Sequence, residues 1–310
     1  MRISRRSLLF GIGSAWLIRA QDADFSAGVN VVTLLATVRD RDGRVIKNLN
    51  RDDFVLEEDG KPQNITYFSR ESDLPLALGL LVDTSRSQIG VLEPERKASY
   101  AFLNQMLRED KDVAFIARFD TQVRVLQGFT SSRQELAAAL DQLAIPGQFA
   151  TLIYEAIRSN SENMMRKREG RKAFILLSDG VSFRDQTTLG TAIEYAQRAD
   201  TIIFSIRYAD HPKFYRPGRA AVEAFTNSHG KGVLQRLSRE TGGEYFDVTA
   251  SQPIEKTYAE IEDLLRNQYS IGYTPQPPGK PGVFHKIKLT VKQPGLIVQT
   301  RDGYFSRERD

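Results

Sequence analysis

The middle of the chain alternates between strand-like and helix-like patterns of apolar residues. Leu76 to Val82 is an almost continuous apolar run, which is typical of a strand buried on both faces. Helical spacing follows over Glu93 to Leu107, and further apolar strands are predicted at 113–119, 173–177 and 201–206. This alternation predicts an α/β fold in which helices cover a doubly wound, mostly parallel sheet.

Shorter elements complete this central unit, which we place at residues 74–266. Residues 123–126 follow the preceding strand too closely for a crossover helix, so they are predicted to form an antiparallel edge strand. A short strand is predicted at 244–246. Further helices are predicted at 132–143, from Leu152, near Thr191, from Val233 and from Ile254.

Both ends of the chain have short β-branched runs separated by turn residues. Six strands are predicted, at 29–38, 54–57, 65–68, 268–274, 283–291 and 296–301. Three short strands bury too little surface to be stable alone. We therefore expect residues 25–73 and 267–310 to combine into one small all-β domain that resembles a sandwich.

The first 20 residues have the pattern of an export signal. A basic start precedes an apolar run from Leu8 to Ile18 that is too short for a stable membrane-spanning helix. Ser4-Arg5-Arg6-Ser7-Leu8-Leu9 also matches the twin-arginine pattern, with a Sec-type signal as the alternative. We expect an exported protein, periplasmic or secreted, that has no membrane span once residues 1–20 are removed.

Composition narrows the classes of function. The chain has 310 residues, 43 of them basic and 39 acidic, but its first 20 residues hold four of the basic residues and none of the acidic ones. The remainder is therefore balanced in charge and gives no reason to expect nucleic-acid binding. Cysteine is absent and only three histidines occur, which excludes disulfides and thiolate sites and disfavours a multi-histidine metal site.

Oxygen-bearing side chains follow three of the predicted elements. Asp83, Ser85 and Ser87 come directly after the first buried strand, Asp179 follows the strand at 173–177, and Thr151 precedes a helix. The carboxyl ends of parallel strands form the ligand-binding edge of such sheets. Each residue alone fits a helix cap or a turn. Together they form a hard-oxygen set suited to Mg²⁺, with Mn²⁺ or Ca²⁺ as alternatives.

The order Asp-x-Ser-x-Ser, then Thr, then Ser-Asp-Gly resembles the metal-ion-dependent adhesion site of von Willebrand factor A (vWA) domains. The resemblance covers about residues 74–266 and implies that the ion is held by Asp83, Ser85, Ser87, Thr151 and Asp179. It implies a non-enzymatic binding or adhesion module, in which an Asp or Glu of a protein ligand completes the coordination. Residues 53–62 and Gly303-Tyr304 resemble a bacterial exported subgroup of these proteins.

Residues near the same edge are candidates for partner binding. Arg86 stands where this family commonly has glycine, so the identity of the ligand stays open. The segment 208–232 is predicted to be a long loop leaving the same edge, which is usual for functional loops, although a surface loop without a role is the alternative. The candidate partner-binding residues are Arg86, His211, Lys213, Tyr215 and Arg216.

Two other functions remain as alternatives. A metal-assisted hydrolase could use the same crevice, but Ser85 or Ser87 would need a histidine base, and all three histidines lie far along the chain. No nucleophile-elbow or phosphate-loop motif occurs. The second alternative is a structural assembly protein that works through its β domain, with an ion that only stiffens loops.

Overall fold

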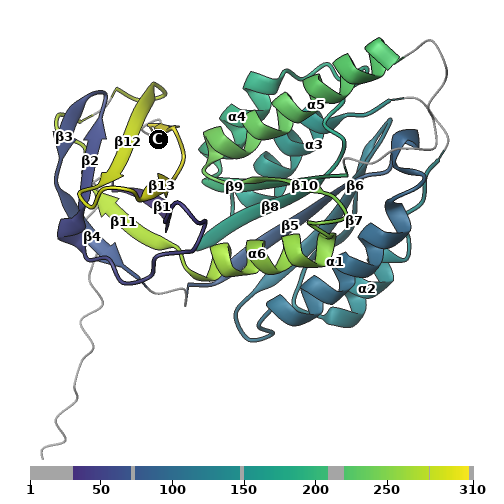
Figure 1. Ribbon diagram of the computed structural model, residues 1–310, viewed down its shortest axis with the longest axis horizontal. Coiled ribbons are helices and arrows are strands. Elements are labelled where there is room, and N and C mark those ends of the chain that lie inside the picture. Colours follow the sequence, from purple (N-terminus) through teal and green to yellow (C-terminus); the bar gives the residue numbers. More distant parts are fainter. Residues whose placement is uncertain (1–30, 71–73, 147–149, 209–219, 279, 307–310) are drawn as a thin grey trace, which may run out of the picture.

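The protein consists of an α/β unit beside a smaller β unit (Figure 1). The computed structural model describes residues 31–70, 74–146, 150–208, 220–278 and 280–306. The predicted export signal lies outside these ranges, as do four of the predicted partner-binding residues, His211, Lys213, Tyr215 and Arg216. Among the described helices, none combines the length and the apolar character needed to cross a bilayer.

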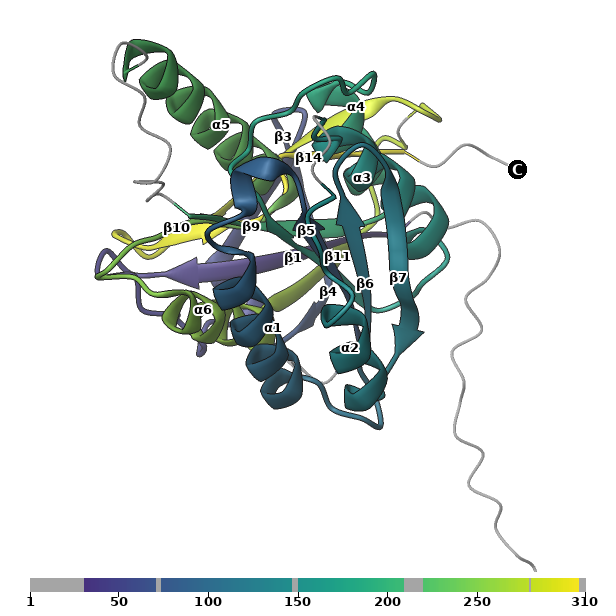
Figure 2. The same ribbon diagram turned by 90° about the vertical axis from the view of Figure 1, so that its right-hand side faces the viewer.

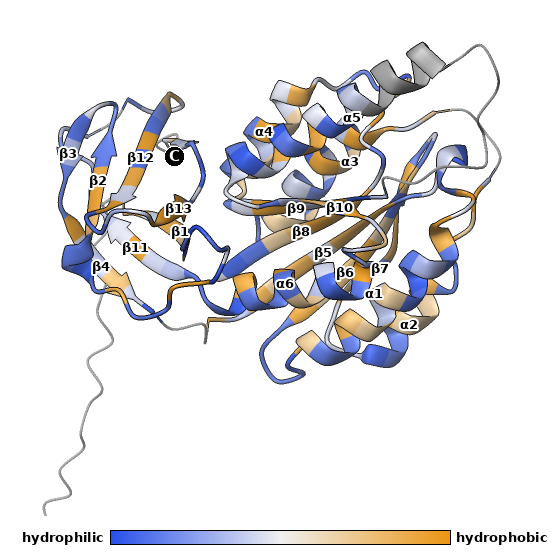
Figure 3. Ribbon diagram, viewed as in Figure 1, coloured by the Kyte–Doolittle hydropathy of each residue, from blue (hydrophilic) through white to orange (hydrophobic). Residues whose placement is uncertain are grey.

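A six-stranded sheet forms the centre of the α/β unit, in the order β10-β9-β8-β5-β6-β7. All neighbours are parallel except β7, which pairs antiparallel with β6 at the edge, as predicted. Every residue of β5 and β8 is buried, which explains the apolar runs at 76–82 and 173–177 (Figure 3). The strands are β5 (Leu76–Asp83), β6 (Val113–Phe119), β7 (Val123–Thr130), β8 (Arg171–Leu177), β9 (Thr201–Tyr208) and β10 (Tyr245–Val248).

Helices cover both faces of this sheet (Figure 2). One core lies between the sheet and α1 (Leu92–Met106), α2 (Arg133–Leu140) and α6 (Ile254–Arg266). The other lies under α3 (Ile153–Asn160), α4 (Leu189–Arg198) and α5 (Ala220–Thr241). Short helical turns occur at η1 (Arg51–Asp53), η2 (Arg86–Gln88) and η3 (Ser161–Met165). The predicted α/β class is confirmed.

Two four-stranded antiparallel sheets form the β unit, in the orders β13-β1-β11-β4 and β14-β12-β2-β3. Each sheet combines strands from both ends of the chain, and apolar residues of both sheets share one core. β3 and β14 are three-residue strands that the sequence pattern did not predict. The strands are β1 (Val32–Arg39), β2 (Phe54–Glu58), β3 (Lys61–Gln63), β4 (Ile65–Ser69), β11 (Tyr269–Tyr273), β12 (Phe284–Val291), β13 (Ile297–Gln299) and β14 (Gly303–Phe305).

The α/β unit is inserted between β4 and β11, which are themselves paired strands. The start of β5 and the end of α6 therefore lie next to the β unit, and the carboxyl ends of the parallel strands point away from it (Figure 1). Ion pairs connect the two units: Arg39 with Glu244, Lys47 with Asp263, and Arg301 with Asp200.

The prediction of a continuous loop over 208–232 is wrong for its second half, because α5 begins at Ala220. Gly230 and Gly232 fall in the predicted loop, yet both lie within the helix. Gly230 is there for a steric reason, since a Cβ at this position would lie 2.4 Å from the carbonyl oxygen of Asp179. The glycine thus allows α5 to pack directly against the loop that follows β8.

Candidate metal centre

Asp83 is the last residue of β5, at the carboxyl edge of the sheet, and its side chain is fully buried. Its Oδ1 accepts a hydrogen bond from the backbone N–H of Ser85 (2.8 Å), and its Oδ2 accepts one from the Ser178 hydroxyl (2.7 Å). Ser178 directly follows β8, the neighbouring strand. The two hydrogen bonds therefore fix the orientation of the carboxylate between two loops.

Ser85 and Ser87 bring two hydroxyl groups together beside Asp83. Their Oγ atoms lie 3.0 Å apart, and Nε2 of the buried Gln88 donates to the Ser87 hydroxyl (3.2 Å). Ser85 has extended backbone and immediately precedes η2. The turn after the strand thus places both hydroxyls of the Asp-x-Ser-x-Ser motif in contact with each other.

Asp179 supplies a second carboxylate at this edge. It follows Ser178, and its Oδ1 accepts a hydrogen bond from the backbone N–H of Val181 (2.9 Å). Burial, and then repulsion from Asp179, raise the pKa of Asp83 to about 7, although hydrogen bonds from Ser178 and Ser85 oppose the shift. A bound cation would relieve the repulsion that Asp179 exerts on the ionised form of Asp83.

Thr151 belongs to a third loop, which pairs with the loop that contains Asp179. Its backbone forms an antiparallel bridge with Phe183, with N···O distances of 3.0 and 3.1 Å. Ser182 also donates a hydrogen bond to the Thr151 carbonyl (3.2 Å). Thr151 is mostly buried and lies two residues before α3. The loop containing Thr151 is thereby held against the segment that follows Asp179.

The von Willebrand factor type A domain family matches residues 78–260, which is more than half of the chain. The chain belongs to this family. The matched region contains all five of the predicted ligand residues, Asp83, Ser85, Ser87, Thr151 and Asp179. A search of curated proteins gave no match.

Several solved structures are similar to this chain at low sequence identity. Proximal thread matrix protein 1 from the mussel byssus, solved with a zinc-occupied MIDAS motif, is 12% identical with a TM-score of 0.50; the match covers 67% of this chain and 50% of that protein. The vWF domain of the type V pili tip protein Mfa5 from Porphyromonas gingivalis is 13% identical (TM-score 0.47, 61% and 94% covered). The PilB minor pilin from Streptococcus sanguinis is 13% identical (TM-score 0.48, 63% and 62% covered). This chain thus spans half the length of the mussel protein.

Asp120 is a buried acidic residue at the same edge of the sheet that the sequence analysis missed. It follows β6 and is buried, and its Oδ2 accepts a hydrogen bond from the Thr84 hydroxyl (2.7 Å) and pairs with Arg118. Its backbone carbonyl accepts from the N–H of Leu152 (3.2 Å). Asp120 therefore connects the loop of Asp83 with the loop of Thr151. Its position directly after a parallel strand, the same signal that identified Asp83, could have found it.

Glu95 is a further acidic side chain close to Asp83 and Asp179. It lies in α1 and is 1% exposed, and among the described residues neither of its carboxyl oxygens has a hydrogen-bond partner. Burial, followed by repulsion from Asp83 and Asp179, raises its pKa well above the usual range. Its place in the helical series with Ser99, Phe102 and Met106, all buried, could have indicated that it faces the core.

Arg86 is the predicted partner-binding residue that lies within the described ranges. It is exposed in η2, between the two serines of the motif. The structure therefore places a cationic side chain at the surface next to the hydroxyl pair.

Proposed function

We propose that this protein is an exported, non-enzymatic binding module that captures a protein ligand through a divalent cation. The cation would be held by Asp83, Ser85, Ser87, Thr151 and Asp179. The observation that carries the proposal is the placement of the buried, hydrogen-bonded Asp83 carboxylate beside the Ser85–Ser87 hydroxyl pair, at the sheet edge where Asp179 also follows its strand. That edge faces away from the β unit, where it would be open to a partner (Figure 1).

The chemistry of the donor set supports a hard divalent ion, with Mg²⁺ first and Mn²⁺ or Ca²⁺ as alternatives. When bound, such an ion is neutralised by two carboxylates and stays Lewis-acidic toward a carboxylate from outside. An Asp or Glu side chain of the partner would meet this requirement. Ser178 and the backbone of Ser85 would keep Asp83 oriented toward the ion.

Selection of the partner would fall to residues around the edge. Arg86 is exposed beside the hydroxyl pair and would attract an acidic surface. His211, Lys213, Tyr215 and Arg216 are proposed to contribute from the segment that precedes α5. We also propose export through the signal at residues 1–20, by the twin-arginine route.

Calorimetric titration of Mg²⁺, Mn²⁺, Ca²⁺ and Zn²⁺ tests the cation part of the proposal. Zn²⁺ is included because the mussel vWA structure contains it. We expect the Asp83→Ala variant to bind one ion fewer than the unchanged protein. The Asp141→Ala variant should bind as many ions as the unchanged protein, since Asp141 is an exposed residue on the turn after α2. Equal binding by both variants and the unchanged protein would contradict the assignment of the ligands.

Acidic peptides test the capture part. With the preferred ion present, peptides that contain a single Glu should bind more tightly than the matched Gln peptides, and the difference should disappear in EDTA. Equal binding of both peptide series, with and without the ion, would contradict capture through a carboxylate while leaving the cation site intact.

A further inference from the structure

Two polar side chains occupy core-facing positions at one end of the β unit. In β12, residues 285, 287 and 289 are buried while their neighbours are exposed, so the inward series is His285, Ile287 and Leu289. In β2 the inward series is Phe54, Leu56 and Glu58. Alternation of this kind predicts apolar residues at every inward position. A histidine and a glutamate that replace them at adjacent sites indicate a role other than packing.

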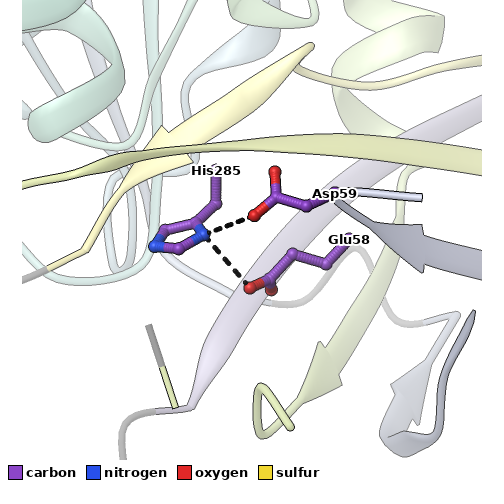
Figure 4. A group of neighbouring side chains, drawn as sticks. All are labelled: Glu58, Asp59 and His285. Carbon is purple, nitrogen blue, oxygen red and sulfur yellow. Dashed lines mark hydrogen bonds and ion pairs between the residues drawn. The ribbon is translucent and has the colours of Figure 1, made fainter. Parts of the chain in front are cut away.

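His285, Glu58 and Asp59 converge on one point (Figure 4). Nδ1 of His285 lies 2.8 Å from Asp59 Oδ2 and 3.4 Å from Glu58 Oε1, and the three atoms are all within 4.8 Å of one another. Ligand atoms around a tetrahedral zinc ion are separated by about 3.3 Å, given bonds of about 2.0 Å. The three groups are therefore already close to the spacing of a metal site.

The remaining carboxylate oxygens are held by neutral donors. Glu58 Oε2 accepts hydrogen bonds from the hydroxyls of Tyr273 (2.5 Å) and Tyr304 (3.2 Å), and Asp59 Oδ1 accepts from the backbone N–H of Lys286 (2.9 Å). Each carboxylate thus presents one oxygen to His285 while its other oxygen is anchored. Outer hydrogen bonds of this kind orient the ligands of metal sites.

The cluster contains two carboxyl groups and one imidazole ring. Burial alone would raise the pKa of Asp59, but hydrogen bonds from His285 and from the Lys286 N–H outweigh this effect and lower it, so Asp59 is ionised at neutral pH. Glu58 is 5% exposed. Both carboxyl groups thus point one oxygen toward the same imidazole nitrogen, which is an arrangement that a divalent cation could bridge.

We propose that Glu58, Asp59 and His285 form a second divalent-cation site, for an ion of the zinc class. One nitrogen and two carboxylate oxygens are ligands that Zn²⁺ accepts, and the half-exposed Asp59 leaves a side of the site open to solvent. Since Tyr273 belongs to the opposite sheet, the ion would reinforce the contact between the two sheets of the β unit. The inference is independent of the function proposed for the vWA edge.

Zinc titration of the full chain carrying Asp83→Ala tests this inference, because that background removes the proposed vWA site. We expect one Zn²⁺ to bind and to raise the melting temperature by several degrees. Co²⁺ should bind in its place and give the visible absorption of a four-coordinate ion. Adding Asp59→Asn, which changes a half-exposed side chain, should lower the Zn²⁺ affinity at least tenfold.

Glu57→Gln is the matched control, since Glu57 lies next to Glu58 but on the outer face, beside Lys288. It should bind Zn²⁺ as tightly as the Asp83→Ala protein. Absence of Zn²⁺ binding in Asp83→Ala, or equal binding with and without Asp59→Asn, would overturn the inference and identify the cluster as an ion pair. His285→Gln, checked for folding by circular dichroism, should abolish binding.

Discussion

The hydroxyl of Ser178 donates a hydrogen bond to Asp83 from the neighbouring strand, one residue before the second carboxylate of the site. This contact stabilises the ionised form of Asp83, whereas burial and Asp179 oppose ionisation. The balance leaves the pKa of Asp83 at about 7, within the range where small changes of pH alter its charge.

Cation binding is therefore expected to depend on pH below 7. A cation must displace the proton from Asp83, so its apparent affinity should rise about tenfold per pH unit up to pH 7 and then level off. Calorimetry at pH 5.5, 6.5 and 7.5 in buffers of different ionisation enthalpy measures the released proton directly. An affinity that does not change over this range would mean that Asp83 is ionised throughout.

The stability of the metal-free protein should show the opposite trend. The pKa of Asp83 is higher in the folded chain than in the unfolded chain, so the folded state binds the proton more strongly between about pH 4 and pH 7. The free energy of unfolding should thus fall by about 2–4 kcal/mol as pH rises through this window. Urea titrations at pH 5 and pH 8 in the presence of EDTA measure whether the free energy of unfolding falls as predicted. In Asp83→Asn this decrease should be absent.

Gly180→Ala should disturb the site through packing. Gly180 has φ +81°, and a Cβ there would lie 2.2 Å from the carbonyl oxygen of Gly230 in α5. We expect the free energy of unfolding to fall by about 3 kcal/mol or more. Cation binding should also weaken, because Asp179 directly precedes Gly180. Gly43→Ala is the control, since Gly43 has φ +83° with no atom within 4 Å of an added Cβ. Gly43→Ala should lower the free energy of unfolding by about 1–2 kcal/mol. An equal loss in both variants would show that the contact with Gly230 does not contribute.

Glu95→Met should stabilise the metal-free protein. The substitution replaces a buried carboxyl group, without hydrogen-bond partners among the described residues, by an apolar side chain of similar volume. We expect the free energy of unfolding to rise by about 1–3 kcal/mol. Glu93→Met, on the exposed side of the same helix, should change it by less than about 0.5 kcal/mol. Destabilisation by Glu95→Met in urea titrations would show that the carboxyl group has a stabilising partner.

Thr84→Val should weaken cation binding although Thr84 is not a proposed ligand. The change removes the hydrogen bond to Asp120, which joins the loops of Asp83 and Thr151, and should cost about 1–2 kcal/mol of stability. We expect a several-fold loss of Mg²⁺ affinity by calorimetry. The Thr66→Val variant, which removes a hydroxyl contact in β4 of the β unit, should leave Mg²⁺ affinity unchanged.

The order of strands and helices could be predicted because the central strands are buried on both faces. Such strands, as in Leu76 to Val82, show an almost continuous run of apolar residues that is easily recognised in a sequence. β3 and β14 escaped prediction because three residues are too few to show an alternation.

The site was less predictable than the fold. Asp83, Ser85 and Ser87 form a contiguous motif, so the sequence alone indicated them. Asp120 has the same local signal as Asp83, a position directly after a parallel strand, but its contact with Thr84 does not follow from that signal. The role of Gly230 depends on its contact with Asp179, which no local pattern shows. Gly230 therefore lay inside the segment predicted as a loop, although the structure places it in α5 against Asp179.

The strand pairing of the β unit also determines which part of the chain can fold first during synthesis. Val32 of β1 pairs with Tyr273 of β11, and Phe54 of β2 pairs with Val291 of β12. β1 and β2 are synthesised first, so they cannot pair until β11 and β12 have been synthesised. The central sheet has all its partners within residues 76–248 and can form in the meantime. A chain that stopped before β12 would keep a folded vWA sheet but expose the edge of β2, and such nascent chains are expected to aggregate.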